Sequence, residues 1–372
     1  MRIRAAVLAS TGGPVEVGDV ELAPPGPGEV LVRLAASGVC HSDLNAVDGT
    51  AETRCPAVLG HEGAGIVEAV GEGVGRVAAG DHVALSWMPS CGRCEECVRD
   101  LPHLCTVAWE AMDHGGLMDG TPRLSQGGAP VYHYVFVSTF AEATVVPERC
   151  VIPIPKDAPL EIAALVGCAV STGVGAVWRT AQVRPGDRVA VFGCGGVGLS
   201  AVLGARAVGA EPIVAVDVSQ AKLDAARELG ATLAVPWAAS AEETGEAVRA
   251  VTGGGVDFAF EATGREQAML AAFLSTRRRG AAVLIGIPRS DAIIPLPART
   301  VARMERRILG SFYGSIRPGR DFAQILSLHA SGRLPLERLI SHRVPLERAP
   351  DALELVRTGA ALRAVLTMEA PG

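Results

Sequence analysis

Four cysteines, Cys91, Cys94, Cys97 and Cys105, lie close together in the chain. Thiolates at such short spacing can converge on one point and hold Zn²⁺ in a tetrahedral site. The alternative is a set of free or disulfide-paired thiols, although disulfides are rare in a reducing compartment. Because a site with four protein ligands has no open position, the pattern predicts a structural zinc that stabilises a loop and does no chemistry.

A glycine-rich motif, Gly-x-Gly-x-x-Gly, is formed by Gly193, Gly195 and Gly198. A predicted strand at 188–192 precedes it, and a predicted helix at 199–208 follows it. In that context the first glycine permits a tight turn, the second lets the backbone approach a pyrophosphate, and the third lets helix and strand pack closely. The helix N-terminus then faces the phosphates. The motif therefore predicts a dinucleotide site.

Asp217 ends the next predicted strand of the same region. A carboxylate at this place accepts hydrogen bonds from the hydroxyls of the adenosine ribose, and it repels a 2′-phosphate. Asp217 therefore predicts a preference for NAD over NADP.

A dispersed set of metal-binding residue types consists of Cys40, His61 and Cys168. Each of them alone would usually be an ordinary buried residue. Two thiolates and one imidazole would leave a fourth position open on zinc, which is the arrangement of a catalytic site. Spacing does not select these three residues, because ligands so far apart in sequence have no short signature.

The order of predicted elements indicates an α/β fold class with two domains. Residues 1 to about 165 are β-rich, with short apolar segments between Gly, Pro and Asp turns. From about 170 strands alternate with helices, which is typical of a doubly wound parallel sheet. The alternation stops near 310, and a final apparent strand at 364–368 is expected to return to the first domain. The predicted segments are 1–169 for the first domain, 170–310 for the second, and 311–372 for the return to the first.

Composition excludes several classes of protein. The chain has 372 residues, of which 49% are hydrophobic and 20% charged, as in a well-cored globular protein. A net charge of −6 offers no basic surface for nucleic acid. Lys156 and Lys222 are the only lysines, so the chain has no Gly-Lys-Ser/Thr phosphate loop. No secretory signal and no apolar stretch of membrane-spanning length is apparent, and we expect a cytoplasmic protein without a membrane partner.

Five motifs in the same order resemble the zinc-dependent alcohol dehydrogenases of the medium-chain dehydrogenase/reductase family. They are Cys40-His41-Ser42-Asp43, Gly60 to Val67, the four-cysteine loop, Gly167 to Gly173, and Gly193 to Gly198. The resemblance covers essentially the whole chain. It implies a GroES-like β-rich catalytic domain and a Rossmann NAD-binding domain, with the active site in the cleft between them. It also implies NAD and two Zn²⁺ per chain as cofactors, and a small alcohol or aldehyde as substrate.

The resemblance also implies roles for individual residues at the catalytic centre. Cys40, His61 and Cys168 would bind the catalytic zinc, while Glu62 could approach the metal. Asp43 would orient His61, and Ser42 would accept the alcohol proton. The residues implied at NAD come from several places: Gly193, Gly195, Gly196, Val197 and Gly198 in the loop, Thr172 and Val197 at the nicotinamide, Asp217 and Lys222 at the ribose, and His41 and Arg363 at the phosphates.

One position departs from the family pattern. Many members pass the proton from the serine through the cofactor ribose to a histidine three positions further on. This chain has Asn45 there, and an amide cannot act as a base. We therefore expect alcohol oxidation to suffer more than aldehyde reduction.

Two aromatic residues are candidate walls of a substrate pocket, Trp87 and Tyr134. The alternative for both is ordinary core packing. If they line the pocket, linear or flat primary alcohols should fit better than bulky secondary ones. The apolar stretch at 282–287, followed by 292–296, resembles the edge through which family members form homodimers; the alternative is an interior strand with its loop.

Two other functions remain open on the sequence. One is a zinc-bearing reductase of an iminium or an activated alkene, favoured only by Asn45. The other is a non-catalytic nucleotide-binding role, which the complete ligand set and glycine loop oppose. The sequence does not identify the substrate.

Overall fold

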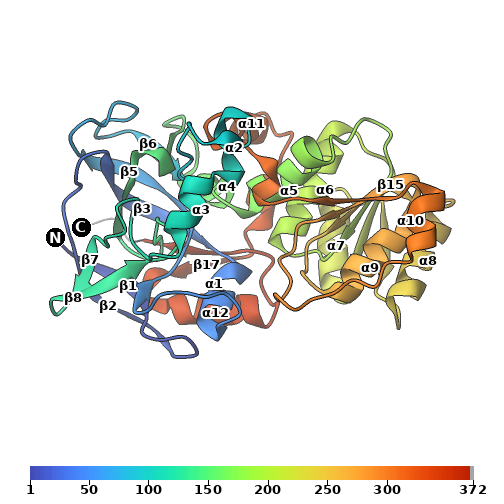
Figure 1. Ribbon diagram of the computed structural model, residues 1–372, viewed down its shortest axis with the longest axis horizontal. Coiled ribbons are helices and arrows are strands. Elements are labelled where there is room, and N and C mark those ends of the chain that lie inside the picture. Colours follow the sequence, from blue (N-terminus) through green and yellow to red (C-terminus); the bar gives the residue numbers. More distant parts are fainter. Residues whose placement is uncertain (369–372) are drawn as a thin grey trace. The chain divides into compact units, whose positions relative to one another are not determined.

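The computed structural model describes residues 1–368, and the chain divides into two folded units (Figure 1). The first unit contains Met1–Cys168, Arg317–Ala330 and residues 340–368. The second contains Ala169–Ile316 and Ser331–Leu339. The first unit is therefore discontinuous in sequence, and the chain enters the second unit twice.

The predicted boundary near 310 differs from the observed one. Residues 311–316 and Ser331–Leu339 belong to the second unit, although the sequence predicted that all of 311–372 returns to the first. Polar contacts explain the difference. The Thr180 hydroxyl lies 2.8 Å from the hydroxyls of both Ser311 and Ser315. The Arg338 guanidinium donates to the Glu228 main-chain carbonyl at 3.0 Å.

The first unit is built from a closed barrel and an open sheet. The barrel has the order β1-β2-β7-β8-β4, and the sheet has the order β10-β6-β5-β3-β18-β17 with β9 also paired to β3. The strands are β1 (Arg2–Leu8), β2 (Val15–Leu22), β3 (Glu29–Val39), β4 (Ala57–Val58), β5 (Glu62–Val70), β6 (His82–Leu85), β7 (Leu124–Gln126), β8 (Ala129–His133), β9 (Ala143–Pro147), β10 (Val151–Pro153), β17 (His342–Pro345) and β18 (Ala364–Thr367).

Strand β3 is the centre of the open sheet. It pairs antiparallel with β5, β9 and β18, and nearly all of its residues are buried. This burial explains the continuous apolar run Val30–Leu34, interrupted only at Arg33. The pairing with β18 shows that the C-terminal strand returns to this unit. The helices of the unit are α1 (His41–Asp48), α2 (Glu95–Val98), α3 (Thr106–Met112), α4 (Leu160–Val166), α11 (Pro318–Ala330) and α12 (Ala349–Arg357).

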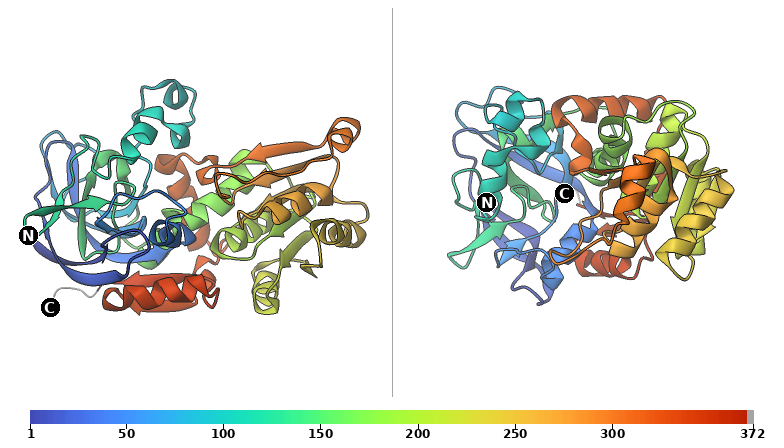
Figure 2. Two further views of the ribbon diagram at one scale, coloured as in Figure 1. Left: turned by 60° about the horizontal axis from the view of Figure 1, so that its bottom comes forward. Right: turned by 45° about the vertical axis from the view of Figure 1, so that its right-hand side comes forward.

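The second unit is a doubly wound sheet with helices packed on it, as its strand–helix alternation predicted (Figure 2). All strand pairs are parallel, in the order β13-β12-β11-β14-β15-β16. The order reverses at β11, and in such sheets ligands bind at the carboxyl ends of the strands beside the reversal. The elements are α5 (Ala169–Gly175), β11 (Val189–Phe192), α6 (Gly196–Val208), β12 (Ile213–Asp217), α7 (Gln220–Leu229), β13 (Leu233–Pro236), α8 (Ala241–Val251), β14 (Val256–Glu261), α9 (Glu266–Ser275), β15 (Thr276–Leu284), α10 (Ala298–Met304) and β16 (Arg307–Gly310).

Within residues 1–368, no single helix combines the length and apolarity needed to cross a membrane. One pair of consecutive helices, Leu160–Val166 with Ala169–Thr180, reaches that length and apolarity only when the two are taken together.

Candidate functional site

The structure brings Cys40, His61, Glu62 and Cys168 together in the first unit. One possible ligand atom of each lies within 4.8 Å of the others, and all four residues are buried. Cys40 follows β3, His61 and Glu62 stand at the start of β5, and Cys168 follows α4. Because β3 pairs with β5, with Gly38 opposite Glu62, sheet register brings the first three residues to one place. The three ligands implied by the resemblance thus converge, although they are far apart in sequence.

The charges of the cluster suit a divalent cation. The hydrogen bond with Cys168 holds the pKa of Cys40 well below its usual range, against the effect of burial. The same bond, together with burial, raises the pKa of Cys168. Cys40 is therefore the more acidic of the two thiols. Buried thiolate and imidazole donors are the ligand set that Zn²⁺ prefers, so these residues fit a zinc ion.

Asp43 holds the imidazole of this cluster. Its carboxylate lies 3.0 Å from Nδ1 of His61 and accepts a hydrogen bond of 2.8 Å from the Cys40 N–H. Burial lowers the pKa of His61, but the Asp43 carboxylate and the Cys40 sulfur together outweigh burial and hold that pKa well above its usual range. With Nδ1 bound to Asp43, Nε2 is left for a metal, which is how metal-binding histidines are normally oriented.

Glu62 and Arg363 form a buried ion pair beside the cluster. The guanidinium donates to the Glu62 carboxylate, and the side chains are 0% and 6% exposed. Burial raises the pKa of Glu62 to about 7, an effect that Arg363 opposes. A buried carboxylate needs such a counter-charge. The family resemblance implied phosphate binding for Arg363; in this structure its guanidinium is paired with Glu62, and the phosphate role stays a prediction.

Ser42 lies next to the sulfur of Cys40. Its hydroxyl oxygen is 3.7 Å from Cys40 Sγ, and the residue is half-buried in the first turn of α1. His41, the first residue of α1, is exposed, and Asn45 is half-buried one turn after Ser42. The helix thus presents Ser42 beside the candidate metal centre.

The two predicted pocket walls differ in their surroundings. Trp87 is half-buried and packs against the main apolar cluster of the first unit. Tyr134 is only 9% exposed, its ring meets that of His61 edge-on at 5.7 Å, and its hydroxyl donates to the Ser42 carbonyl at 2.9 Å. Tyr134 is therefore tied into the metal centre itself.

Cys91, Cys94, Cys97 and Cys105 converge in a second cluster of the first unit. The Sγ atoms of Cys91 and Cys97 are 4.0 Å apart, and those of Cys94 and Cys105 are 3.9 Å apart. A tetrahedron with Zn–S bonds of about 2.3 Å has edges of about 3.8 Å, so the spacing fits zinc. Main-chain N–H groups donate to the sulfurs, and the one at Cys97 lowers the pKa of Cys94 to about 5. The four residues are free cysteines.

The glycine motif lies in the second unit, between β11 and α6. Gly193 has a φ of +90°, and a Cβ on Gly198 would lie 1.8 Å from the Gly193 carbonyl oxygen. Both glycines are therefore required by the fold. Gly195 differs, because a Cβ there would meet nothing within 4 Å. The open space at Gly195, before the first residues of α6, Gly196 and Val197, is where a pyrophosphate would approach the backbone.

Asp217 stands beside this loop at the end of β12. Its carboxylate accepts hydrogen bonds from the N–H groups of Cys194 at 2.7 Å and Ser219 at 2.9 Å. Lys222 is half-buried in the following helix α7. Thr172 lies in α5, where the neighbouring Gly173 packs so closely on the start of α6 that a Cβ would lie 2.2 Å from the Val197 carbonyl oxygen.

Sequence reasoning missed Glu261, a buried carboxylate at the end of β14. It accepts hydrogen bonds from the N–H groups of Thr263 at 2.6 Å and Gly264 at 3.0 Å. A methyl carbon of Thr263 in turn fills the space against Gly193. The available signal was a carboxylate ending a predicted strand of the parallel sheet, as Asp217 does.

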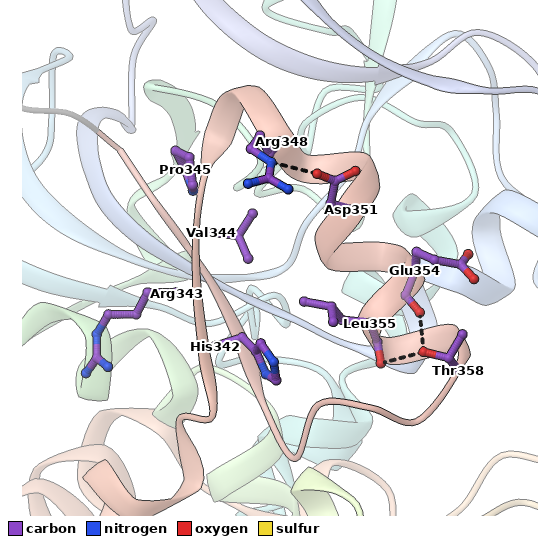
Figure 3. Close-up of a pocket in the computed structure, with 9 residues that line it drawn as sticks. All are labelled: His342, Arg343, Val344, Pro345, Arg348, Asp351, Glu354, Leu355 and Thr358. Atoms are coloured by element: carbon purple, nitrogen blue, oxygen red, sulfur yellow. Dashed lines mark hydrogen bonds and ion pairs between the residues drawn. The ribbon is translucent and has the colours of Figure 1, made fainter.

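A cavity of about 440 Å³ lies elsewhere in the first unit, between β17 and α12 (Figure 3). Its arginines are already paired, Arg348 with Asp351 at 2.7 Å and Arg343 with Glu161 at 2.8 Å. None of the predicted site residues lines it, so the cavity is separate from the candidate metal centre.

Comparisons with known proteins agree with this arrangement. Residues 26–156 match the family model of the alcohol dehydrogenase GroES-like domain, and residues 196–331 match that of zinc-binding dehydrogenases. An alcohol dehydrogenase zinc-binding domain protein from Burkholderia ambifaria is 36% identical, with a TM-score of 0.95 over 100% of both chains. Benzyl alcohol dehydrogenase from Acinetobacter calcoaceticus is 30% identical, with a TM-score of 0.94 over 99% of this chain and 100% of its own. A zinc-binding dehydrogenase from Sinorhizobium meliloti 1021, bound to NADP, is 26% identical, with a TM-score of 0.81 over 99% of both chains.

Proposed function

Because the chain belongs to the zinc-dependent medium-chain alcohol dehydrogenase family, we propose that it interconverts a primary alcohol and its aldehyde, with NAD as the hydride carrier. The observation that carries this proposal is the buried cluster of Cys40, His61 and Cys168. These three residues would hold a zinc ion, and because the fourth candidate of the cluster, Glu62, is paired with Arg363, a bound zinc would keep one position for substrate.

The residues around the cluster have separable tasks. Zn²⁺ in this site supplies Lewis-acid chemistry, which makes an alcohol easier to deprotonate. Asp43 holds His61 in the tautomer that leaves Nε2 free. The Ser42 hydroxyl, 3.7 Å from Cys40 Sγ, accepts the proton of the alcohol while it passes its own proton on to solvent. The glycine loop and Asp217 orient the nicotinamide cofactor, which is the main contribution of a protein to hydride transfer.

The choice of NAD over NADP rests on Asp217. Its carboxylate ends β12 next to the glycine loop, where negative charge repels a 2′-phosphate. The Sinorhizobium relative is bound to NADP, so both cofactors belong in the test.

The proposal includes a partner for the chain, which is a second copy of the same chain. The stretch 282–284, which the sequence predicted at a dimer edge, lies instead in the interior strand β15, between β14 and β16. The edge of the sheet is β16, and an edge strand offers unpaired main-chain groups. Ile308 in β16 is 38% exposed, and Ile287 and Ile293 nearby in sequence are 68% and 80% exposed. We propose a homodimer through this edge, and light scattering of the zinc-loaded protein measures its mass.

The test of function follows nicotinamide absorbance with zinc-loaded protein. Benzaldehyde and linear aldehydes are offered with NADH and with NADPH, beside Cys168→Ala and the matched control Cys55→Ala, whose thiol lies outside both clusters. We expect turnover with NADH that is lost in Cys168→Ala and kept in Cys55→Ala. Tight NADH binding without turnover of any aldehyde would contradict the proposal and direct the search to iminium or alkene substrates.

A further inference from the structure

The turn that follows Tyr134 has an unusual backbone. Val135, Phe136 and Ser138 have φ values of +40°, +69° and +41°, a region that residues other than glycine rarely adopt and that is most costly for β-branched valine. Strain of this kind persists only where the surroundings hold it, and it concentrates at functional sites. We therefore expect specific contacts that hold this turn, and a side chain at a functional site that the turn holds in place.

Ser138 holds the turn. Its hydroxyl accepts a hydrogen bond of 3.0 Å from the Tyr134 N–H and donates one of 2.8 Å to the Val58 carbonyl. Ser138 is fully buried, and the neighbouring Thr139 hydroxyl lies 2.6 Å from that of Ser37. These bonds fix the strained backbone against the barrel and the open sheet.

Tyr134 is the side chain that the turn positions. Its hydroxyl donates to the main-chain carbonyl of Ser42 at 2.9 Å. Its ring contacts the His61 imidazole edge-on, with centroids 5.7 Å apart and planes at 70°, a favourable aromatic geometry. His61 is thus fixed by Asp43 at Nδ1 and by the phenol ring from another direction. Both contacts are with residues of the proposed catalytic centre.

We propose that Tyr134 is a positioning residue of the metal centre: its hydroxyl fixes the main chain at Ser42, and its ring fixes the His61 imidazole. This inference rests on the proposed function. It assigns Tyr134 a role in the metal centre, whereas the sequence suggested only a wall of the substrate pocket. A phenylalanine would supply the ring and the wall but would leave the Ser42 carbonyl without this bond.

The test compares Tyr134→Phe with the matched control Tyr132→Phe. Tyr132 lies in the same strand region but is half-buried under Arg54, 4.5 Å from its ring centroid. Zinc content, melting temperature, kcat, KM and the isotope effect with α-deuterated alcohol are measured for each. We expect Tyr134→Phe to keep its zinc and KM but to lose roughly tenfold in kcat, because small displacements of reacting groups are costly. The isotope effect should rise, since hydride transfer becomes more rate-limiting, and Tyr132→Phe should match the wild type.

Wild-type kcat and isotope effect in Tyr134→Phe, or equal losses in both variants, would overturn the inference. If the proposed function itself is wrong, the wild-type protein will turn over no alcohol, which distinguishes that failure from a failure of this inference. In that case the visible spectrum of the cobalt-substituted protein tests whether Tyr134 positions His61. A changed spectrum in Tyr134→Leu, with wild-type cobalt content, supports the positioning of His61, and an unchanged spectrum refutes it.

Discussion

The Asp43 carboxylate joins two of the three candidate zinc ligands, since one oxygen contacts His61 Nδ1 at 3.0 Å and the other accepts the Cys40 N–H at 2.8 Å. Asp43 is itself completely buried. Because this carboxylate is shielded from bulk solvent, its two protein bonds must offset the cost of burying it. The same bonds prearrange the metal centre before any ion arrives.

Replacing Asp43 should therefore weaken zinc binding at this site. We expect Asp43→Ala to lower zinc affinity by about 10- to 100-fold, the usual effect of removing a carboxylate behind a metal-bound histidine. Competition with a chelator measures the affinity. Asp48→Ala, an exposed carboxylate at the end of the same helix, serves as the control. Equal affinities in the two variants would show that Asp43 does not orient the ligand.

Gly195 and Gly198 should respond differently to substitution by alanine. A Cβ on Gly198 would lie 1.8 Å from the Gly193 carbonyl oxygen, whereas one on Gly195 would meet no protein atom within 4 Å. We expect Gly195→Ala to melt like the wild type but to bind NADH at least about tenfold more weakly, because the methyl group occupies the approach of the pyrophosphate. Gly198→Ala should lose thermal stability as well. NADH titration and melting curves check both, and unimpaired NADH binding by Gly195→Ala would place the cofactor elsewhere.

His133 should make the protein less stable in mild acid. It is 3% exposed, and burial lowers its pKa to about 3, from an ordinary value of 6.5. Below pH 6.5 His133 is protonated in the unfolded chain but stays neutral in the folded chain. The free energy of unfolding therefore decreases as the pH is lowered from 6.5 towards the folded pKa of about 3. Between pH 7 and 5 the loss is about 2 kcal/mol.

The variant that checks this loss is His133→Gln, which keeps an acceptor for the Arg123 N–H that now donates to His133 Nε2 at 3.1 Å. Urea unfolding at pH 7 and pH 5 gives the decline in free energy of unfolding for each protein. The decline should be about 2 kcal/mol smaller in the variant. All other titrating groups are common to both proteins, so identical declines would exclude His133 as the cause.

The sequence could predict features whose residues are neighbours in the chain. The four cysteines and the glycine loop each lie within one short segment, so spacing alone indicated their chemistry. Strand–helix alternation likewise predicted the parallel sheet of the second unit, because each strand and its helix are consecutive. The fold of the second unit therefore followed from local pattern.

Contacts between distant segments could not be predicted in this way. Glu62 and Arg363 are 301 residues apart, and Tyr134 is 92 residues from Ser42. Neither pair leaves a periodic or spaced signal. The metal set of Cys40, His61 and Cys168 was found only through resemblance to a family. The return of Ser331–Leu339 to the second unit was missed for the same reason, since side-chain bonds rather than a change of pattern hold that segment.

The absence of a histidine one turn after Ser42 should leave a kinetic signature. Ser42 and Asn45 are three residues apart on α1 and both half-buried, so they share a face of the helix. An amide cannot accept the proton that Ser42 receives from an alcohol, and general-base catalysis typically contributes about 10²- to 10⁴-fold. Asn45→His should therefore raise kcat for alcohol oxidation, most strongly above pH 6.5, where an ordinary histidine is neutral. Aldehyde reduction, in which Ser42 donates a proton instead of accepting one, should change less.

Steady-state pH profiles of alcohol oxidation and of aldehyde reduction measure the effect. Indistinguishable forward and reverse profiles in the wild type and the variant would show that the proton leaves by a route that does not pass this face of α1.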